Sequence, residues 1–332
     1  DANVWKNIGG GDGDVQPWVY AGSTAGYTFG GSRGSGASTN SDHIDKYSFA
    51  SGAAAASSHV ASLPYSAAYT TSAISAATHS YNMGGNQLTG PGNAHGLLTR
   101  FAYASDSQDN SITGYITNSQ SIGSHTCLSA GDYGFVCGGS RTGDNPSDSV
   151  DKVSTISDTN STSSTNLSRG CYQLSPATDN VYGYLANGWK GAPGYGSTRI
   201  ERMSFASEVN SGEIGNTGSE GIAGSAGISS STHAYIPGLQ SAVSGVTYSH
   251  AMKYAFASSG ISSSNTFAIT AIGSRSMGAS ASSESNGFIA MGATSANAQS
   301  NSVDTFLFSG DTTIANIGTL SRPGRDIAGA HV

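Results

Sequence analysis

The sequence predicts an all-β fold, a six-bladed β-propeller whose ring is closed when the C-terminal strand pairs with the N-terminal blade. Three observations predict it: an aromatic phrase that returns about every fifty residues, glycines that follow this phrase, and a C-terminal segment that supplies the strand missing from the first repeat. A repeat of this length indicates one supersecondary unit copied in tandem. We therefore expect an N-terminal arm or linker over residues 1–25 and one propeller over residues 26–332.

Each repeat begins with a short strand that carries an aromatic residue and ends near glycine. The first copy is Gly26–Gly31, with the sequence Gly-Tyr-Thr-Phe-Gly-Gly, and later copies begin near residues 80, 134, 183, 234 and 287. Glycine supplies the positive φ angles that tight turns require. The pattern therefore predicts a turn directly after each of these strands.

A second strand follows after a polar loop, and in it large residues alternate with small ones. This alternation gives a strand two different faces, which suits a position between neighbouring sheets. The copies are Ile44–Ser51, Leu98–Ser105, Val150–Thr155, Ile200–Ser207, Met252–Ser258 and Val303–Ser309.

Two further strands complete each unit, and four strands per repeat describe a propeller blade. The third strand is predicted at Val60–Pro64, Ser164–Arg169, Ile269–Arg275 and Ala315–Arg322. The fourth consists almost wholly of small residues, at Ser66–Ala73, Gly221–Ala226 and Met277–Ala281. We place it innermost, because blades crowd together near the axis. The C-terminal segment Asp326–Val332 would be the sixth such strand and would pair beside Gly26–Gly31.

Composition excludes several classes of partner. The net charge is −7 and the sequence has no cluster of Lys and Arg, which argues against nucleic acid and anionic membranes. No apolar run approaches the roughly 18–20 residues of a membrane span. The three cysteines, Cys127, Cys137 and Cys171, fit neither a disulfide framework nor a zinc site, so we interpret them as small buried hydrophobic residues.

The ionisable residues give no catalytic constellation, and we predict no enzyme activity, no cofactor and no metal. Candidate groups recur in register with the repeat, which favours a structural role. They are His79 and His233 at strand ends, the acids Asp45, Asp151, Glu201 and Asp304 beside Lys46, Lys152 and Arg202, and the arginines Arg169, Arg275 and Arg322 between blades. Asp12–Asp14 and Asp106–Asn110 could supply oxygen ligands to Ca²⁺, but neither has the pattern of an EF-hand loop.

The loops that follow the aromatic strands are the longest and most varied, and we expect them to share one face of the disc. Loops on a rigid scaffold commonly carry binding sites. The loop Trp189–Thr198 contains Trp189, Lys190 and Tyr195, which are the candidate surface-binding residues, because exposed aromatic residues stack on sugars or anchor protein contacts. The alternative is that Trp189 covers the rim of its own blade.

The order of these strands resembles the kelch-type propeller repeat. In that family a small-residue strand is followed by an aromatic strand ending in Gly-Gly, a strand of alternating apolar residues and an outer strand closing near an Arg. The segments Ile44–Ser51 and Thr78–Tyr81 look like the kelch-like repeats of structural proteins of marine bacteriophages.

This resemblance implies a non-enzymatic virion structural protein, a tail, fibre or capsid-surface component that binds a host receptor or glycan. Its location would be the particle surface, within a homo-oligomer or larger assembly, with the N-terminal arm contacting other virion proteins. The first alternative is a secreted carbohydrate-binding or carbohydrate-oxidising propeller, since some kelch-fold oxidases bind copper through Tyr, His and Cys. A further alternative is an intracellular adaptor.

Overall fold

The structure is a computed structural model. It describes residues 22–32, 40–50, 58–67, 73–83, 85, 97–115, 124–141, 145–191, 196–217, 222–223, 226–238, 240–241, 244, 246–248, 250–257, 266–268, 275–294, 296 and 298–332. The predicted N-terminal arm lies outside these residues up to residue 21, and the first strand begins at Ala25.

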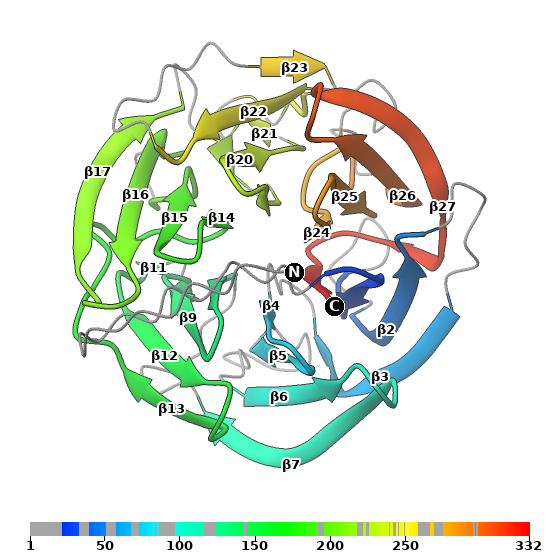
Figure 1. Cartoon of the computed structure of the whole chain (residues 1–332), viewed down its shortest axis with the longest axis horizontal. Coiled ribbons are helices and arrows are strands. Elements are labelled where there is room, and N and C mark those ends of the chain that lie inside the picture. Colours follow the sequence, from blue (N-terminus) through cyan, green and yellow to red (C-terminus); the bar gives the residue numbers. More distant parts are fainter. Residues whose placement is uncertain are drawn as a thin grey trace, which may run out of the picture.

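Six four-stranded antiparallel sheets are arranged in a ring, as Figure 1 shows, and this confirms the predicted six-bladed propeller. The innermost strands of blades 1 to 6 are β28 (Ala328–His331), β4 (Ala73–Ser75), β8 (Thr126–Ala130), β14 (Ser175–Thr178), β19 (Ile228–Ser229) and β24 (Ala279–Ser282). The aromatic strands are β1 (Ala25–Phe29), β5 (His79–Met83), β9 (Tyr133–Cys137), β15 (Tyr182–Ala186), β20 (His233–Ile236) and β25 (Asn286–Ala290).

The third and outermost strands continue each blade away from the axis. The third strands are β2 (Ser41–Ser48), β6 (Leu97–Ala102), β12 (Val150–Ser154), β16 (Arg199–Ser204), β22 (His250–Ala255) and β26 (Ser300–Leu307). The outermost strands are β3 (Ser58–Ala67), β7 (Ser107–Tyr115), β13 (Thr159–Thr162), β17 (Asn210–Asn216), β23 (Thr266–Ala268) and β27 (Thr312–Gly324). Two small ribbons are added, β10 (Ser140–Arg141) with β11 (Asn145–Pro146), and β18 (Ile222–Ala223) with β21 (Gln240–Ser241).

The C-terminal strand closes the ring as predicted. β28 pairs with β1 in antiparallel register, with Gly26 opposite His331 and Phe29 opposite Ala328. The N–H of Thr24 donates to the carbonyl of Val332 at 2.8 Å, so the pairing continues to the last residue. Blade 1 is therefore built from both ends of the described chain.

The core lies between the blades, where aromatic side chains of neighbouring blades pack on each other and other large side chains meet glycine. Tyr27 in β1 packs against Phe101 and Tyr103 of blade 2, with ring centroids 5.2 Å apart in both pairs. The opposite faces of the aromatic strands must be small: a Cβ added at Gly134 in β9 would lie 2.2 Å from the Ile74 side chain of blade 2. This packing explains the alternation of large and small residues in the sequence.

Some predicted strand positions were wrong. In blade 5 the innermost strand is Ile228–Ser229, whereas part of the predicted Gly221–Ala226 forms β18 instead. In blade 2 the innermost strand starts at Ala73, the last residue of the predicted segment. In blade 3 the outermost strand is Thr159–Thr162 and not Ser164–Arg169. Runs of Ser, Gly, Ala and Thr have little hydrophobic periodicity, so the sequence does not mark which of them enters the sheet.

Other predictions can be compared directly. Cys127, Cys137 and Cys171 are buried and form no disulfide, as expected, and burial raises the pKa of the Cys137 thiol. In the part of the chain that the structure describes, no helix has the length and apolar character needed to cross a membrane.

Candidate functional site

The predicted surface-binding residues are only partly described. Trp189 is half-buried and stacks on Tyr172, with ring centroids 6.4 Å apart and an interplanar angle of 9°. The backbone N–H of Trp189 donates to the backbone carbonyl of Tyr172 at 2.8 Å, so Trp189 packs at the edge of its own blade. Lys190 is also half-buried, and Tyr195 lies outside the described residues. A ligand role for these three residues remains a prediction.

Among the described residues, a cavity of about 450 Å³ lies on the propeller axis. Its walls are the innermost strands, and its mouth is formed by the turns that join innermost strands to aromatic strands and third strands to outermost strands. Because antiparallel strands alternate in direction, these turns lie on the face opposite the loops that follow the aromatic strands. The loop that begins at Trp189, predicted from the sequence to carry the binding residues, belongs to that other face.

A ring of polar side chains surrounds this cavity at one level. The six residues occupy the same register position in the six innermost strands. Each lies opposite the second residue of the aromatic strand in its blade. They are Ser75, Ser129, Thr178, Ser229, Ser282 and His331. We call this set the axial ring.

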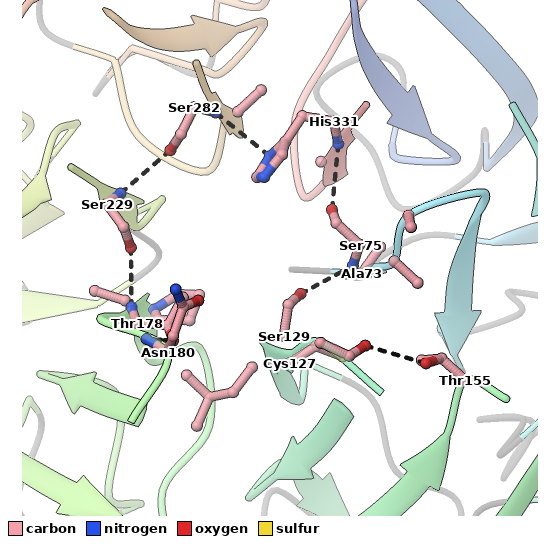
Figure 2. A pocket seen from close by; sticks show the side chains of 18 of the residues that line it. Ala73, Ser75, Cys127, Ser129, Thr155, Thr178, Asn180, Ser229, Ser282 and His331 are labelled. Atoms are coloured by element: carbon pink, nitrogen blue, oxygen red, sulfur yellow. Dashed lines mark hydrogen bonds between the residues drawn. The ribbon is translucent and has the colours of Figure 1, made fainter. Parts of the chain in front are cut away.

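Hydrogen bonds link the axial ring from blade to blade, as Figure 2 shows. In each link a backbone N–H donates to the side chain of a neighbouring blade. The links run from Ser75 N–H to Ser129 Oγ (2.9 Å), Thr178 N–H to Ser229 Oγ (2.9 Å), Ser229 N–H to Ser282 Oγ (3.2 Å), Ser282 N–H to His331 Nδ1 (3.4 Å) and His331 N–H to Ser75 Oγ (3.2 Å). The side chains thus satisfy backbone donors that would otherwise face the axis.

The pattern changes at one step, between blades 3 and 4. There the Thr178 hydroxyl accepts the N–H of Asn180 from its own blade at 3.1 Å, instead of an N–H from Ser129. Asn180 lines the cavity and has a left-handed φ of 72°. Its Nδ2 is shielded from solvent and has no hydrogen-bond partner among the described residues. Asn180 therefore lines the cavity while its amide nitrogen is a shielded donor without a partner among the described residues.

The mouth of the cavity is asymmetric. The turn residues that line it come from blades 2, 3 and 4, among them Ala77, Asp132, Ile156 and Asn180. Large exposed apolar side chains gather on the same face of blades 3 and 4. They are Tyr133 (42% exposed) at the start of β9, and Ile156 (73%), Val181 (57%) and Val209 (55%) in turns. The blade 2–4 sector of the rim therefore combines polar groups with apolar surface.

The cavity lining is close to neutral. Asp132 is the one carboxylate among the described lining residues, and none of them is Lys or Arg. Burial lowers the pKa of His331 to about 4, so its imidazole is uncharged at neutral pH and can accept the N–H of Ser282. The site offers hydroxyls, backbone groups and small apolar side chains.

Most of the recurring cations are used between blades, whereas Arg202 lies over the ring of Tyr182 in its own blade, 4.7 Å from the centroid. Third-strand cations reach forward to an acidic residue in the outer hairpin turn of the next blade. The pairs are Lys46 with Asp106 (2.8 Å), Arg100 with Asp158, Lys152 with Glu208 (2.7 Å) and Lys253 with Asp311 (2.9 Å). In two of these ties a tyrosine hydroxyl also donates to the carboxylate, Tyr27 to Asp106 at 2.9 Å and Tyr81 to Asp158 at 2.6 Å.

The buried acids of the third strands point the other way, toward the preceding blade. Asp45 accepts from Ser321 Oγ of blade 6 at 2.7 Å, and Asp304 forms a buried ion pair with Arg275. Arg322 donates to the carbonyl of Gly30 and Arg169 donates to Ser197 Oγ at 3.0 Å. Adjacent residues of one strand thus tie both neighbouring blades, and for Lys46, Lys152, Asp45, Asp304 and the three arginines this confirms the structural interpretation.

The remaining candidates also have structural partners. His79 Nδ1 lies 2.7 Å from Thr78 Oγ1, and His233 Nδ1 lies 2.8 Å from Thr232 Oγ1, so both histidines are strand-end hydrogen-bonding groups. In the predicted calcium candidate Asp106–Asn110, Asp106 binds Lys46 and Asp109 binds Arg100. Within the described residues there is no group of three or more His, Cys, Asp or Glu that could hold a metal ion. Asp12–Asp14 lies outside them.

The sequence was also compared with known proteins. No model of a protein family matches the chain, and no curated protein sequence matches it.

Proposed function

We propose that this chain is a non-enzymatic structural protein of a bacteriophage particle, a tail, fibre or capsid-surface component that also recognises the host surface. The proposal rests first on the resemblance of Ile44–Ser51 and Thr78–Tyr81 to kelch-like repeats of such proteins. Because propellers serve many functions, the fold alone does not favour one of them.

The observation that carries the proposal is the use of the recurring charged residues as ties between blades. The pairs Lys46–Asp106, Lys152–Glu208 and Lys253–Asp311 join consecutive blades, and Asp304 and Arg275 are paired inside an interface. Residues that would otherwise suggest acid–base chemistry thus hold the scaffold together. A rigid disc of this kind suits a protein that presents loops and a cavity on a particle surface.

A secreted carbohydrate-binding propeller is the second candidate, and the axial cavity favours it. The two candidates differ in where the protein resides. Particles are purified on a density gradient from the culture that produces the protein, and each fraction is analysed by mass spectrometry. We expect peptides of this chain at a constant ratio to the major capsid protein across the particle peak. Peptides found only in the soluble culture medium would contradict the virion assignment and support the secreted protein.

A further inference from the structure

We propose that the axial cavity binds a neutral saccharide, which enters through the blade 2–4 sector of the rim. The inference rests on the proposed function, because it names the site and the ligand class that recognition of a host glycan would use. It places this site on the face opposite the loop of Trp189.

The size of the cavity fits such a ligand. Small-molecule sites commonly occupy roughly 300–1,000 Å³, and the axial cavity measures about 450 Å³. The six innermost strands surround it, and the ties between blades fix their positions. A mono- or disaccharide would therefore meet a site that is formed before binding, which lowers the entropic cost of association.

The lining matches the mixed surface of a sugar. A Ser or Thr hydroxyl has one donor and two acceptor positions, so a hydroxyl that accepts one backbone N–H still has a proton and a lone pair to offer. Ser129 and Ser282 are hydroxyls of this kind in the axial ring. Ala76, Ala77 and Ala177 add small apolar surface, which suits the C–H faces of a pyranose.

The charge of the lining distinguishes between sugars. An anionic sugar would lose its hydration and find no Lys or Arg among the described lining residues, while Asp132 would repel it. His331 is uncharged at neutral pH because burial lowers its pKa to about 4, so it offers no positive charge. Neutral hexoses and N-acetylhexosamines avoid this cost. The lining therefore selects against sialic acids, uronic acids and sugar phosphates.

The polar recognition point lies where the axial ring changes its pattern. Between blades 3 and 4, Thr178 bonds within its own blade, and the amide nitrogen of Asn180 has no partner among the described residues. Ile156 and Val181 flank this point on neighbouring turns, and Ile156 lines the cavity. Because this nitrogen is shielded from solvent, the Asn180 side chain must rotate to donate to a sugar hydroxyl, while the sugar ring covers the apolar side chains.

The test is saturation-transfer NMR on the full chain with glucose, galactose, mannose and N-acetylglucosamine at about 10 mM each. N-acetylneuraminic acid and glucose 6-phosphate serve as anionic probes. We expect transfer to at least one neutral sugar and at least fivefold less to the anionic ones. Absence of transfer to every neutral sugar, or equal transfer to the anionic sugars, would overturn the inference.

Three variants locate the site. Ala77 is exposed, lines the cavity and sits in the turn before β5, so Ala77→Trp should obstruct the mouth without disturbing the core. Asn180→Gly removes the amide and tolerates the left-handed backbone. Ser231→Trp, at the equivalent exposed turn position of blade 5, is the matched control, because Ser231 does not line the cavity.

We expect Ala77→Trp and Asn180→Gly to weaken sugar binding at least fivefold, while Ser231→Trp binds as the parent does. Melting temperatures show whether each variant is folded. Undiminished binding in Ala77→Trp would place the sugar elsewhere and overturn the inference. If the sugar binds in the cavity but the chain is absent from purified particles, the proposed virion function fails while the cavity assignment stands.

Discussion

At the scale of single residues, the outer hairpin turns use one arrangement repeatedly. The acidic residue in the turn adopts a φ angle between 48° and 58° and forms an ion pair with a cation of the preceding blade. These acidic residues are Asp106, Asp158, Glu208 and Asp311. Aspartate tolerates this left-handed conformation better than most residues. The turn geometry therefore directs a carboxylate into the interface between blades.

The tie between blades 2 and 3 gives the first prediction. Asp158 accepts from the Tyr81 hydroxyl at 2.6 Å and pairs with Arg100, and its side chain is 27% exposed. Asp158→Asn keeps the backbone conformation but removes the charge, so we expect a loss of about 1–2 kcal/mol in the free energy of unfolding. Denaturant unfolding measures it. Asp132→Asn, in an exposed turn of the same face, should change stability by less than about 0.5 kcal/mol; equal losses in both variants would contradict the tie.

The sequence predicted that these charges are structural but did not identify their partners. Lys46 stands next to Asp45 in the chain, yet its partner is Asp106 in the following blade. Adjacent residues of a strand point to opposite faces, so the sequence neighbour is excluded, whereas the true partner depends on how two blades align. For the same reason the sequence alone leaves Asp106 as a candidate calcium ligand.

Two titratable groups near the C-terminus give a prediction about pH. Burial raises the pKa of Asp326 from 3.8 to about 6, so this group stabilises the folded state at acidic pH, and that stabilisation is lost as pH rises from about 4 to 6. Burial lowers the pKa of His331 from 6.5 to about 4, so its contribution is lost as pH falls through the same interval. The two groups therefore change the free energy of unfolding with pH in opposite directions.

Asp326→Asn should therefore remove one of these two opposing pH dependences of the free energy of unfolding. Asparagine tolerates the φ of 55° at this position and carries no charge into the interior. We expect the variant to be more stable than the parent at pH 7 by about 2–3 kcal/mol, and the gain to disappear near pH 4. Chemical denaturation at pH 4, 5, 6 and 7 measures the difference. A difference that is constant over this range would show that Asp326 does not titrate as proposed.

At the scale of elements, the innermost strands show why the sequence is so rich in small residues. A Cβ added at Gly329 in β28 would lie 2.2 Å from the carbonyl oxygen of Ser280, and one added at Gly227 would lie 1.8 Å from that of Pro176. Backbones of neighbouring blades thus approach each other directly around the axis. Larger residues at these positions would push the blades apart.

Gly329→Ala tests this close approach. The contacting atom belongs to the backbone and cannot rotate away, so we expect a loss of about 1–3 kcal/mol in the free energy of unfolding. Gly212→Ala is a useful comparison, because nothing lies within 4 Å of its added carbon and only its φ of 74° is strained. The melting temperature should fall because of steric overlap in the first variant and backbone strain alone in the second. Unchanged stability of Gly329→Ala would mean that the innermost strands are not tightly packed.

Sequence reasoning placed small residues at the axis but did not predict the cavity or the axial ring. Ser75, Ser129 and Thr178 look like ordinary members of Ser- and Thr-rich stretches, and they are about fifty residues apart in the chain. Their shared level becomes visible only when the register of every blade is known. Asn180 could have been noticed as an amide in a turn, but no sequence signal links it to the axis.

At the scale of the whole molecule, the closing strand decides whether the ring holds. Ala328 and Ala330 of β28 pack in one cluster with Tyr27 and Phe29 of β1. Deleting Asp326–Val332 would remove the innermost strand of blade 1, expose this cluster and leave an open sheet edge beside β1. We expect a sharp fall in melting temperature, measured by circular dichroism. A truncated chain as stable as the parent would refute closure by β28.

If the ring is the stable unit, the position of the chain ends should matter little. The carbonyl of Val332 accepts from Thr24, so the end of β28 and the start of β1 are placed like an ordinary turn between an innermost and an aromatic strand. A circular permutant can therefore join Val332 to Gly22 through a short linker and open the chain within residues 116–123, between β7 and β8. This permutant lacks residues 1–21, so the control is the unpermuted chain without the same residues. We expect the two proteins to melt within a few degrees of each other, since the permutant retains every strand and blade-to-blade tie that the structure describes. If the permutant fails to fold while the control folds, stability depends on where the chain begins, and the closed ring does not by itself account for it.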